Sequence, residues 1–390
     1  MSRPGKARQF PFLAVTTLSI AVVGVTAPAW APKALANAEQ AATSTARPAR
    51  PARVSGPGPQ ARPAVNSAIA GYVLSGDGTG YYTYNSADAG AGAVTVTSIG
   101  TGVFKVIFAK LSSIAGTAAP QVTAFNAADN CVLNIPTPAA SDLQVIVGCT
   151  RVATGNPDGD AEFDLVVTRP VHPVGGTFDY SVITKLSGTM KQHQYNSAGK
   201  PNTVRHLGTG MFQVVLGGPK TTGRRGIVKV SSLQPSNGGC QLMGWQGSAD
   251  GVVVDVNCYA YPHTLADRHF VVTYTTASSL MGINHQFAAN AFAVGSAPVY
   301  QPTVQYDSTR GARVTIVHYK TGTYEVLPAG SAGDVAKFGG DVEVSAVGSK
   351  GQFCITNGWS QELTPSISVA CYDRNGILTD APFTVAWVVP

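Results

Sequence analysis

The chain has 390 residues, a formal net charge of +6 and only 12% charged residues. Eight of the 27 basic residues but one of the 21 acidic residues precede residue 67, so residues 67–390 carry a net charge of −1. The basic excess therefore belongs to the N-terminal segment, and we exclude nucleic acid as a default partner of the rest.

The N-terminus has the pattern of a secretory signal peptide. Basic residues at positions 3, 6 and 8 precede an apolar stretch from Phe10 to Val25, and Ala34-Leu35-Ala36 forms a signal-peptidase site. We predict a cleaved signal peptide over 1–36 and a disordered Pro/Ala/Arg-rich tail over 37–66. No second apolar run reaches membrane length, so the sequence predicts a secreted protein that is extracellular or held at the cell surface.

Three repeats fill the remaining chain. The motif at Tyr84-Asn85-Ser86 returns at Tyr195 and at Tyr306, each 111 residues further on. A Gly-Thr-Gly turn, a cysteine pair and an Asp-x-x-Phe motif follow in the same order, although Lys320 replaces the first glycine of the turn in the third copy. We predict repeats over 67–176, 177–286 and 287–390.

The cysteines predict one disulfide in each repeat. Six cysteines in a secreted chain allow 15 pairings, and the repetition favours equivalent bridges inside the repeats. The predicted pairs are Cys131 with Cys149, Cys240 with Cys258, and Cys354 with Cys371.

The patterning between these landmarks is that of β-strands. Short runs such as Val103–Phe108 and Phe163–Val167 are rich in β-branched and aromatic residues and are bounded by turn residues. No long stretch has helical periodicity. We predict an all-β chain of three tandem antiparallel β-sandwich domains, jelly-roll-like, each with one disulfide.

The complete repeat pattern resembles the β-rich repeats, about 110 residues long, of secreted actinobacterial and myxobacterial proteins. It runs from Tyr-Asn-Ser through Gly-Thr-Gly, Cys, Gly-Trp and Cys to Asp-x-x-Phe, over about residues 70–390. That family has no assigned activity, so the resemblance implies secretion and repetition only.

Two tryptophans are the first candidates for ligand binding. Trp245 and Trp359 each follow the first cysteine of their repeat by five residues, whereas repeat one has Pro136 there. The structural interpretation is a packing residue over the disulfide. The functional interpretation is an exposed aromatic platform for sugar rings.

A basic segment between strands of repeat two is the second candidate. Lys220, Arg224, Arg225 and Lys229 place four positive charges within ten residues. Such a loop could bind a phosphate, a sulfate or an anionic glycan. A solvated loop is the ordinary alternative.

Two metal hypotheses are weaker. Asn156, Asp158, Asp160 and Glu162 alternate as oxygen ligands do in calcium loops, although an Asp-rich hairpin turn has the same pattern. Five of the seven histidines fall in or next to repeat two and could form a zinc or copper site, or be ordinary surface residues. They are His193, His206, His263, His269 and His285.

One acidic residue recurs in every repeat, three positions before the last phenylalanine. These residues are Asp160, Asp267 and Asp380. We expect each of them to accept backbone N–H bonds at the start of the last strand.

No enzymatic signature motif is present. The leading hypothesis is a secreted, non-enzymatic, multivalent binding module for a polysaccharide, the cell wall or a surface protein, because three linked weak sites raise apparent affinity. No cofactor is predicted beyond the calcium candidate, and the pattern specifies no oligomeric state. The alternatives are a secreted hydrolase or hydrolase inhibitor with a site between repeats, and a structural coat protein.

Overall fold

The computed structural model describes residues 69–389 except 77–78, 89–92, 170–176, 186–189, 219–225, 234–236, 280–286, 310–311, 330–339 and 361–364. The predicted signal peptide and tail lie outside these residues. The described chain is all-β, as predicted, and its one helical turn is the 3₁₀ segment η1 (Ser112–Ile114).

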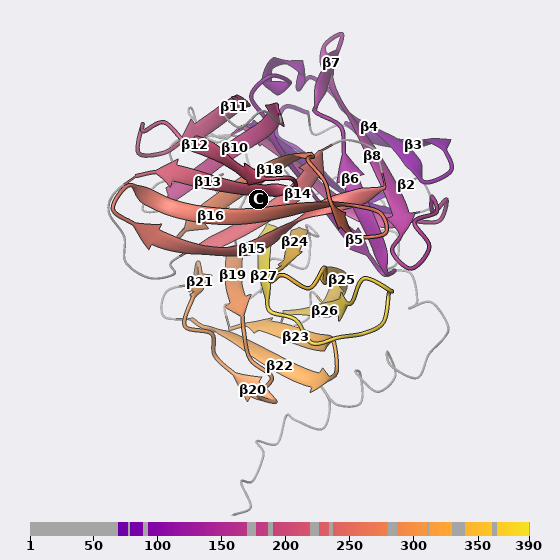
Figure 1. Ribbon diagram of the computed structural model, residues 1–390. Helices are drawn as coiled ribbons and strands as arrows, with labels where there is room; N and C mark the ends of the chain where they lie inside the picture. Colours follow the sequence, from indigo (N-terminus) through magenta and orange to yellow (C-terminus); the bar gives the residue numbers. More distant parts are fainter. Residues whose placement is uncertain are drawn as a thin grey trace, which may run out of the picture. The chain divides into compact units, whose positions relative to one another are not determined.

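Each repeat forms an axial sheet, so named because one of its strands contacts the equivalent strands of the other two repeats near the centre of the molecule (Figure 1). In repeat one the sheet order is β2 (Thr79–Asn85), β1 (Ile69–Gly76), β9 (Glu162–Arg169), β5 (Ala119–Phe125). In repeat two it is β11 (Met190–Asn196), β10 (Thr177–Lys185), β18 (His269–Thr276), β14 (Ile227–Leu233). In repeat three it is β21 (Gln305–Asp307), β19 (Phe287–Ala293), β27 (Phe383–Val389), β24 (Asp341–Ala346).

Each repeat also forms an outer sheet. In repeat one it contains β3 (Val94–Gly100), β4 (Val103–Phe108), β8 (Asp142–Arg151), β6 (Asp129–Leu133) and β7 (Thr137–Ala139). In repeat two it contains β12 (Thr203–Gly208), β13 (Met211–Gly217), β16 (Gly251–Ala260), β15 (Gly238–Ser248) and β17 (Thr264–Leu265). In repeat three it contains β20 (Val299–Tyr300), β22 (Val314–Lys320), β23 (Thr323–Pro328), β26 (Ser366–Tyr372) and β25 (Phe353–Ser360).

The axial and outer sheets of a repeat share a hydrophobic core. In repeat one, Phe104 and Val106 of β4 alternate inward and meet Phe163 and Leu165 of β9. The ring centroids of Phe104 and Phe163 are 5.4 Å apart, so the Phe of the Asp-x-x-Phe motif is a core residue. This alternation of buried and partly exposed positions is what the sequence patterning predicted.

The three predicted disulfides are confirmed. Each joins directly opposite residues of two neighbouring outer strands, with Cα atoms 4.1, 3.9 and 4.0 Å apart. The enclosed loops span 18, 18 and 17 positions, and closing such a loop in the unfolded chain contributes roughly 3 kcal/mol.

The sheets do not end at the repeat boundaries. The axial strand β5 pairs in parallel with β25 of repeat three, and β14 pairs in parallel with β6 of repeat one. A parallel bridge between Val347 and Leu242 joins repeat three to repeat two in the same way. Since sheets are shared between neighbours, the repeats form a closed cycle of contacts, and the tandem jelly-roll arrangement stays a prediction.

Equivalent positions also meet at the centre, where β5, β14 and β24 contact one another (Figure 1). The backbone N–H of Val122 donates to Ser231, that of Val230 to Ser345, and that of Val344 to Thr123, at 3.2, 3.3 and 3.0 Å. Each repeat thus donates to the next in a ring of three hydrogen bonds. This ring is the strongest sign that the repeats are related by a pseudo-threefold axis.

Candidate functional site

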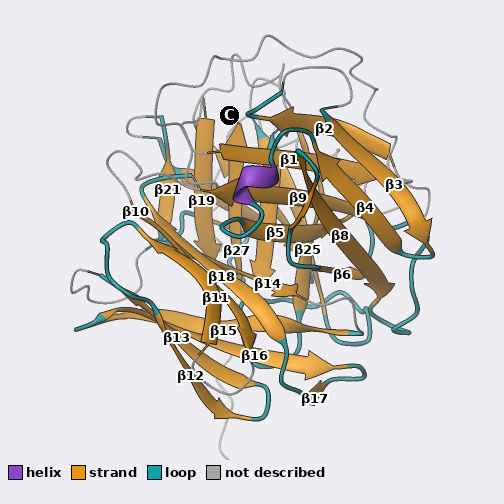
Figure 2. Cartoon of the chain, turned by 90° about the horizontal axis from the view of Figure 1, so that it is seen from above, coloured by secondary structure: helices purple, strands orange, loops and turns teal. Residues whose placement is uncertain are grey.

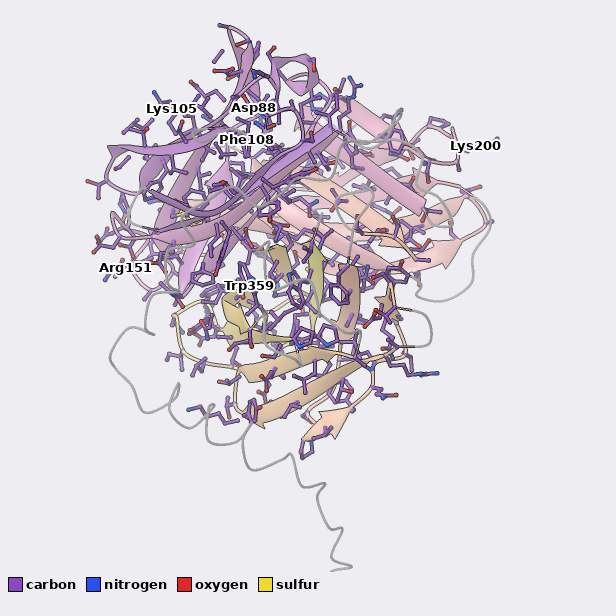
Figure 3. All side chains as sticks on the ribbon, turned by 180° about the vertical axis from the view of Figure 1, so that it is seen from behind. Asp88, Lys105, Phe108, Arg151, Lys200 and Trp359 are labelled. Carbon is purple, nitrogen blue, oxygen red and sulfur yellow. A yellow bond between two sulfur atoms is a disulfide. The ribbon has the colours of Figure 1, made fainter. Side chains whose placement is uncertain are left out.

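The two tryptophans seal contacts between repeats. Trp245 is 2% exposed and packs edge-on against Phe292 of repeat three, with ring centroids 4.7 Å apart. Trp359 is half-buried between Phe125 and Tyr82 of repeat one, where Figure 3 labels it. A buried ring offers no face to a sugar, so Trp245 is not an exposed platform. A ligand-binding role for Trp359 stays a prediction.

The basic segment divides into two parts. Lys220, Arg224 and Arg225 lie outside the described residues. Lys229 is in β14, only 2% exposed, so the prediction that it belongs to a surface loop is wrong. Its apolar neighbours in the sequence, Ile227 and Val228, continue the strand.

Lys229 instead lies in a buried polar layer on the pseudo-threefold axis. Its ammonium forms an ion pair with Glu343 at 2.6 Å and donates to the carbonyls of Val122 and Val344. The Thr123 hydroxyl, which also accepts from Lys229, donates to Glu343 at 2.5 Å. Gln121, Lys229 and Glu343 each lie three residues before the strand residue that pairs with the phenylalanine of the Asp-x-x-Phe motif. They are therefore equivalent, and the same position holds an amide, a cation and an anion in the three repeats.

A carboxyl pair lies close to this layer. Asp164 of repeat one and Asp341 of repeat three are both buried, and Asp164 accepts a hydrogen bond from the Val342 backbone at 2.7 Å. Burial, reinforced by the neighbouring acids, raises the pKa of both carboxyl groups well above the ordinary value. This pair belongs to the contact between repeats, because Asp164 of repeat one bonds to the backbone of repeat three.

The calcium candidates are engaged separately. Arg151 pairs with Asp158 at 2.9 Å, and Asn126 donates to Glu162 at 2.7 Å. The backbone N–H of Asp160 donates to Asp158, as in a hairpin turn, and Asn156 lies on the exposed side. In the described part of the chain, no three His, Cys, Asp or Glu side chains are grouped to hold a metal ion.

The histidines of repeat two are likewise apart. His206 pairs with Asp267 at 2.9 Å, and His263 contacts the carbonyl of Arg374 in repeat three. His193 and His269 lie in β11 and at the start of β18, and His285 lies outside the described residues.

The recurring acid has the expected structural role in two repeats. Asp267 accepts the Gly210 N–H at 2.6 Å and Asp380 accepts the Gly322 N–H at 2.7 Å, each at the tip of a hairpin. Burial opposes ionisation of these carboxyl groups, but the backbone N–H and a neighbouring histidine outweigh it and lower the pKa of both. The acid therefore anchors the turn to the start of the last strand.

One position breaks the repetition at a contact between repeats. Tyr72, Tyr180 and Asn290 are equivalent, because each pairs across its axial sheet with the tyrosine of the repeated motif. The Tyr72 side chain inserts into repeat three and fills the contact like a plug, and its hydroxyl accepts the Gly340 N–H at 3.1 Å. Tyr180 is plugged into repeat one, where its hydroxyl donates to the Thr117 carbonyl.

Asn290 faces repeat two in the same way but is much shorter. Its amide donates to the carbonyl of Ser278 at 3.2 Å and leaves space beyond it. A cavity of about 380 Å³ occupies this place, lined by both repeats. Strand β10 of repeat two and strands β19 and β21 of repeat three, labelled in Figure 2, contribute to the lining.

A second lining residue differs in size from its counterpart in repeat one. In repeat one the ring of Phe108, labelled in Figure 3, fills the end of the core so closely that a Cβ on Gly71 would lie 2.5 Å from it. Leu216 takes the equivalent place in repeat two and lines the cavity. Asn290 and Leu216, each smaller than its counterpart in repeat one, therefore border the cavity between repeats two and three.

The cavity holds one carboxylate. Asp179 lies where repeat one has Gly71 and repeat three has Ala289, and it is 6% exposed. Its Oδ1 accepts bonds from the backbone and the hydroxyl of Ser197, at 2.8 and 3.1 Å. Burial outweighs these bonds and raises the pKa of Asp179 to about 6, so the group is mostly ionised at neutral pH.

The rest of the lining combines hydrogen-bonding groups with apolar walls. Polar side chains come from both repeats, and Leu216 and Val252 supply apolar surface. The polar residues include Thr276, Asn290, Thr303, Gln305 and Tyr306.

In comparisons with known proteins, the chain matches no protein-family model, no curated protein and no solved structure. A functional proposal therefore depends on the geometry of the cavity. Within the described ranges, no helix has the length and apolarity needed to cross a membrane.

The sequence analysis missed Asp179, Asn290 and Tyr306 as a site. An alignment of the repeats carries the signal, since two copies have tyrosine where the third has asparagine. The strand pairing was needed to recognise that position, because the spacing to the Tyr-Asn-Ser motif differs between the repeats.

Proposed function

We propose that this chain is a secreted, non-enzymatic binding protein that holds one sugar unit of a glycan or cell-wall polymer in the cavity between repeats two and three. The observation that carries the proposal is the replacement of a plugging tyrosine by Asn290, which opens one contact of three. The volume of the cavity, about 380 Å³, falls in the usual range for small-ligand pockets.

The chemistry of the lining supports a hydroxyl-rich ligand. A carboxylate, two amides and several hydroxyls surround an apolar wall, so a ligand with both hydroxyls and a hydrocarbon face can be satisfied there. The three disulfides and the predicted signal peptide are in keeping with an extracellular location.

A binding role is favoured over glycoside hydrolysis by the number of acids. Glycosidases use two carboxyl groups about 5–10 Å apart. Among the described residues that line the cavity, Asp179 is the single carboxyl group. One site per chain also replaces the multivalency expected from sequence, because the equivalent contacts are occupied by Tyr72 and Tyr180.

Retention of the full oxidised protein on insoluble cell wall, chitin and cellulose tests the proposal. We expect retention that survives high salt and EDTA, and loss of retention in Asn290→Tyr, which supplies the plug found at the other two contacts. Asn290→Ala is the matched control, because it keeps the cavity open. Retention of a folded Asn290→Tyr protein at the wild-type level would overturn the proposal.

A further inference from the structure

Tyr306 differs from its two counterparts in what covers its ring. Tyr84 stacks on Tyr72 with centroids 5.7 Å apart and planes at 18°, and Tyr195 stacks on Tyr180 at 6.3 Å and 17°. Tyr306 pairs with Asn290, which has no ring. Tyr306 packs against an apolar cluster that includes Ala288 and Val388, and it also lines the cavity. Among the described residues, no aromatic ring stacks on it as Tyr72 and Tyr180 stack on its counterparts.

The place beside the Tyr306 ring differs from its two counterparts in what it holds. In the other two repeats a six-membered ring fills it, parallel to the tyrosine and ending in a hydroxyl that reaches the backbone of the neighbouring repeat. The equivalent backbone in repeat two begins at Gly226, which also lines the cavity. A ligand ring at this position would therefore find an aromatic face beside it and polar groups at its rim.

We propose that a pyranose ring stacks on Tyr306 in the place that the rings of Tyr72 and Tyr180 occupy elsewhere, with Asp179 accepting its hydroxyl groups. This inference rests on the proposed function and specifies its ligand. A pyranose has C–H groups on its faces and hydroxyls around its rim, which matches an aromatic face bordered by hydrogen-bond acceptors.

Asp179 sets the charge that the site accepts. Both of its hydrogen bonds fall on Oδ1, and the side chain has no cationic partner among the described residues. A nearly buried carboxylate binds hydroxyl donors strongly and repels an anionic group brought into the same low-dielectric space. Through this charge, Asp179 favours neutral pyranosides over uronates.

Calorimetry with cellohexaose, chitohexaose and a hexauronate tests this assignment. We expect one of the neutral oligomers to bind, the hexauronate to bind at least about tenfold more weakly, Tyr306→Phe to keep affinity and Tyr306→Leu to lose about tenfold. Tyr84→Leu is the matched control, because the same change in repeat one lies away from the cavity. Asp179→Asn should reduce or remove the preference against the uronate.

The two proposals fail separately. If Asn290→Tyr abolishes binding while Tyr306→Leu binds as the wild type does, the cavity is the site but the stacking assignment is wrong. If the hexauronate binds best, the charge assignment is wrong. If none of the three oligomers binds, the pyranose is overturned as the ligand, whereas retention on cell wall that Asn290→Tyr abolishes would still support the cavity.

Discussion

The contact between repeats one and two and the contact between repeats two and three are built from equivalent strands but have different contents. Tyr180 fills the first, stacks on Tyr195 and bonds to the backbone of repeat one. Asn290 stands at the second and leaves a cavity of about 380 Å³. Asn290 in the place of a tyrosine thus distinguishes a candidate binding site from a structural contact built on equivalent strands.

Both contacts depend on the axial layer, and breaking that layer should have the largest effect. We expect Glu343→Ala to destabilise the protein by about 3–5 kcal/mol, because it leaves the Lys229 ammonium buried without its counter-charge. Chemical denaturation measures this. Gln121→Ala, at the equivalent position of repeat one, should cost less because no charge is left unpaired. Equal losses for the two variants would contradict the electrostatic explanation.

Opening the filled contact is the direct way to break the comparison. Tyr180→Asn should destabilise the protein by about 2–4 kcal/mol, because a fully buried ring and its hydrogen bond are removed. It should also create a second cavity, detectable by uptake of xenon in a crystal. A variant with wild-type stability would show that Tyr180 does not support the contact.

Asp179 gives the open contact a pH dependence. Its pKa is raised by burial from 3.8 to about 6, so the folded state binds the proton more tightly than the unfolded chain. The stabilisation is complete below about pH 4 and is lost as pH rises to about 6, a change of roughly 2–3 kcal/mol. Between these pH values, the denaturation midpoint of the wild type should fall further than that of Asp179→Asn, which cannot ionise. An unchanged profile in the variant would contradict the prediction.

Filling the open contact should have the smallest effect on stability and sharpens the comparison. We expect Asn290→Tyr to raise stability by about 1 kcal/mol, because the new ring buries apolar surface and stacks on Tyr306. Thermal melts measure this change. Destabilisation would show that the cavity cannot accept the plug that its counterparts hold.

Much of the fold was accessible from local signals. Alternation in Val103–Phe108 predicts a strand with one buried face, and the nearly equal spacing of the cysteines predicts three equivalent bridges. The Asp267 and Asp380 anchors also follow from their recurrence before the last strand. These features depend on neighbours in the chain or on a hairpin partner, which periodicity and repetition encode.

The site was less accessible, because residue type alone does not show what a side chain faces. Trp245 and Lys229 have the chemistry of ligand-binding residues, yet both are buried at contacts between repeats. Asn290 has an ordinary side chain and draws its importance from the tyrosines at the equivalent positions. A pattern search weighs residues one by one and therefore selected the tryptophans and the basic segment.

By itself, the sequence determined the all-β class, the threefold repetition and the three disulfides, because short-range patterning and covalent pairing are properties of the chain. The tertiary structure decided that sheets continue from one repeat into the next, that Lys229 meets Glu343 on a common axis, and that one contact is open. These outcomes depend on side-chain volume and charge brought together from residues more than a hundred positions apart. Packing in three dimensions, which no local pattern records, fixes them.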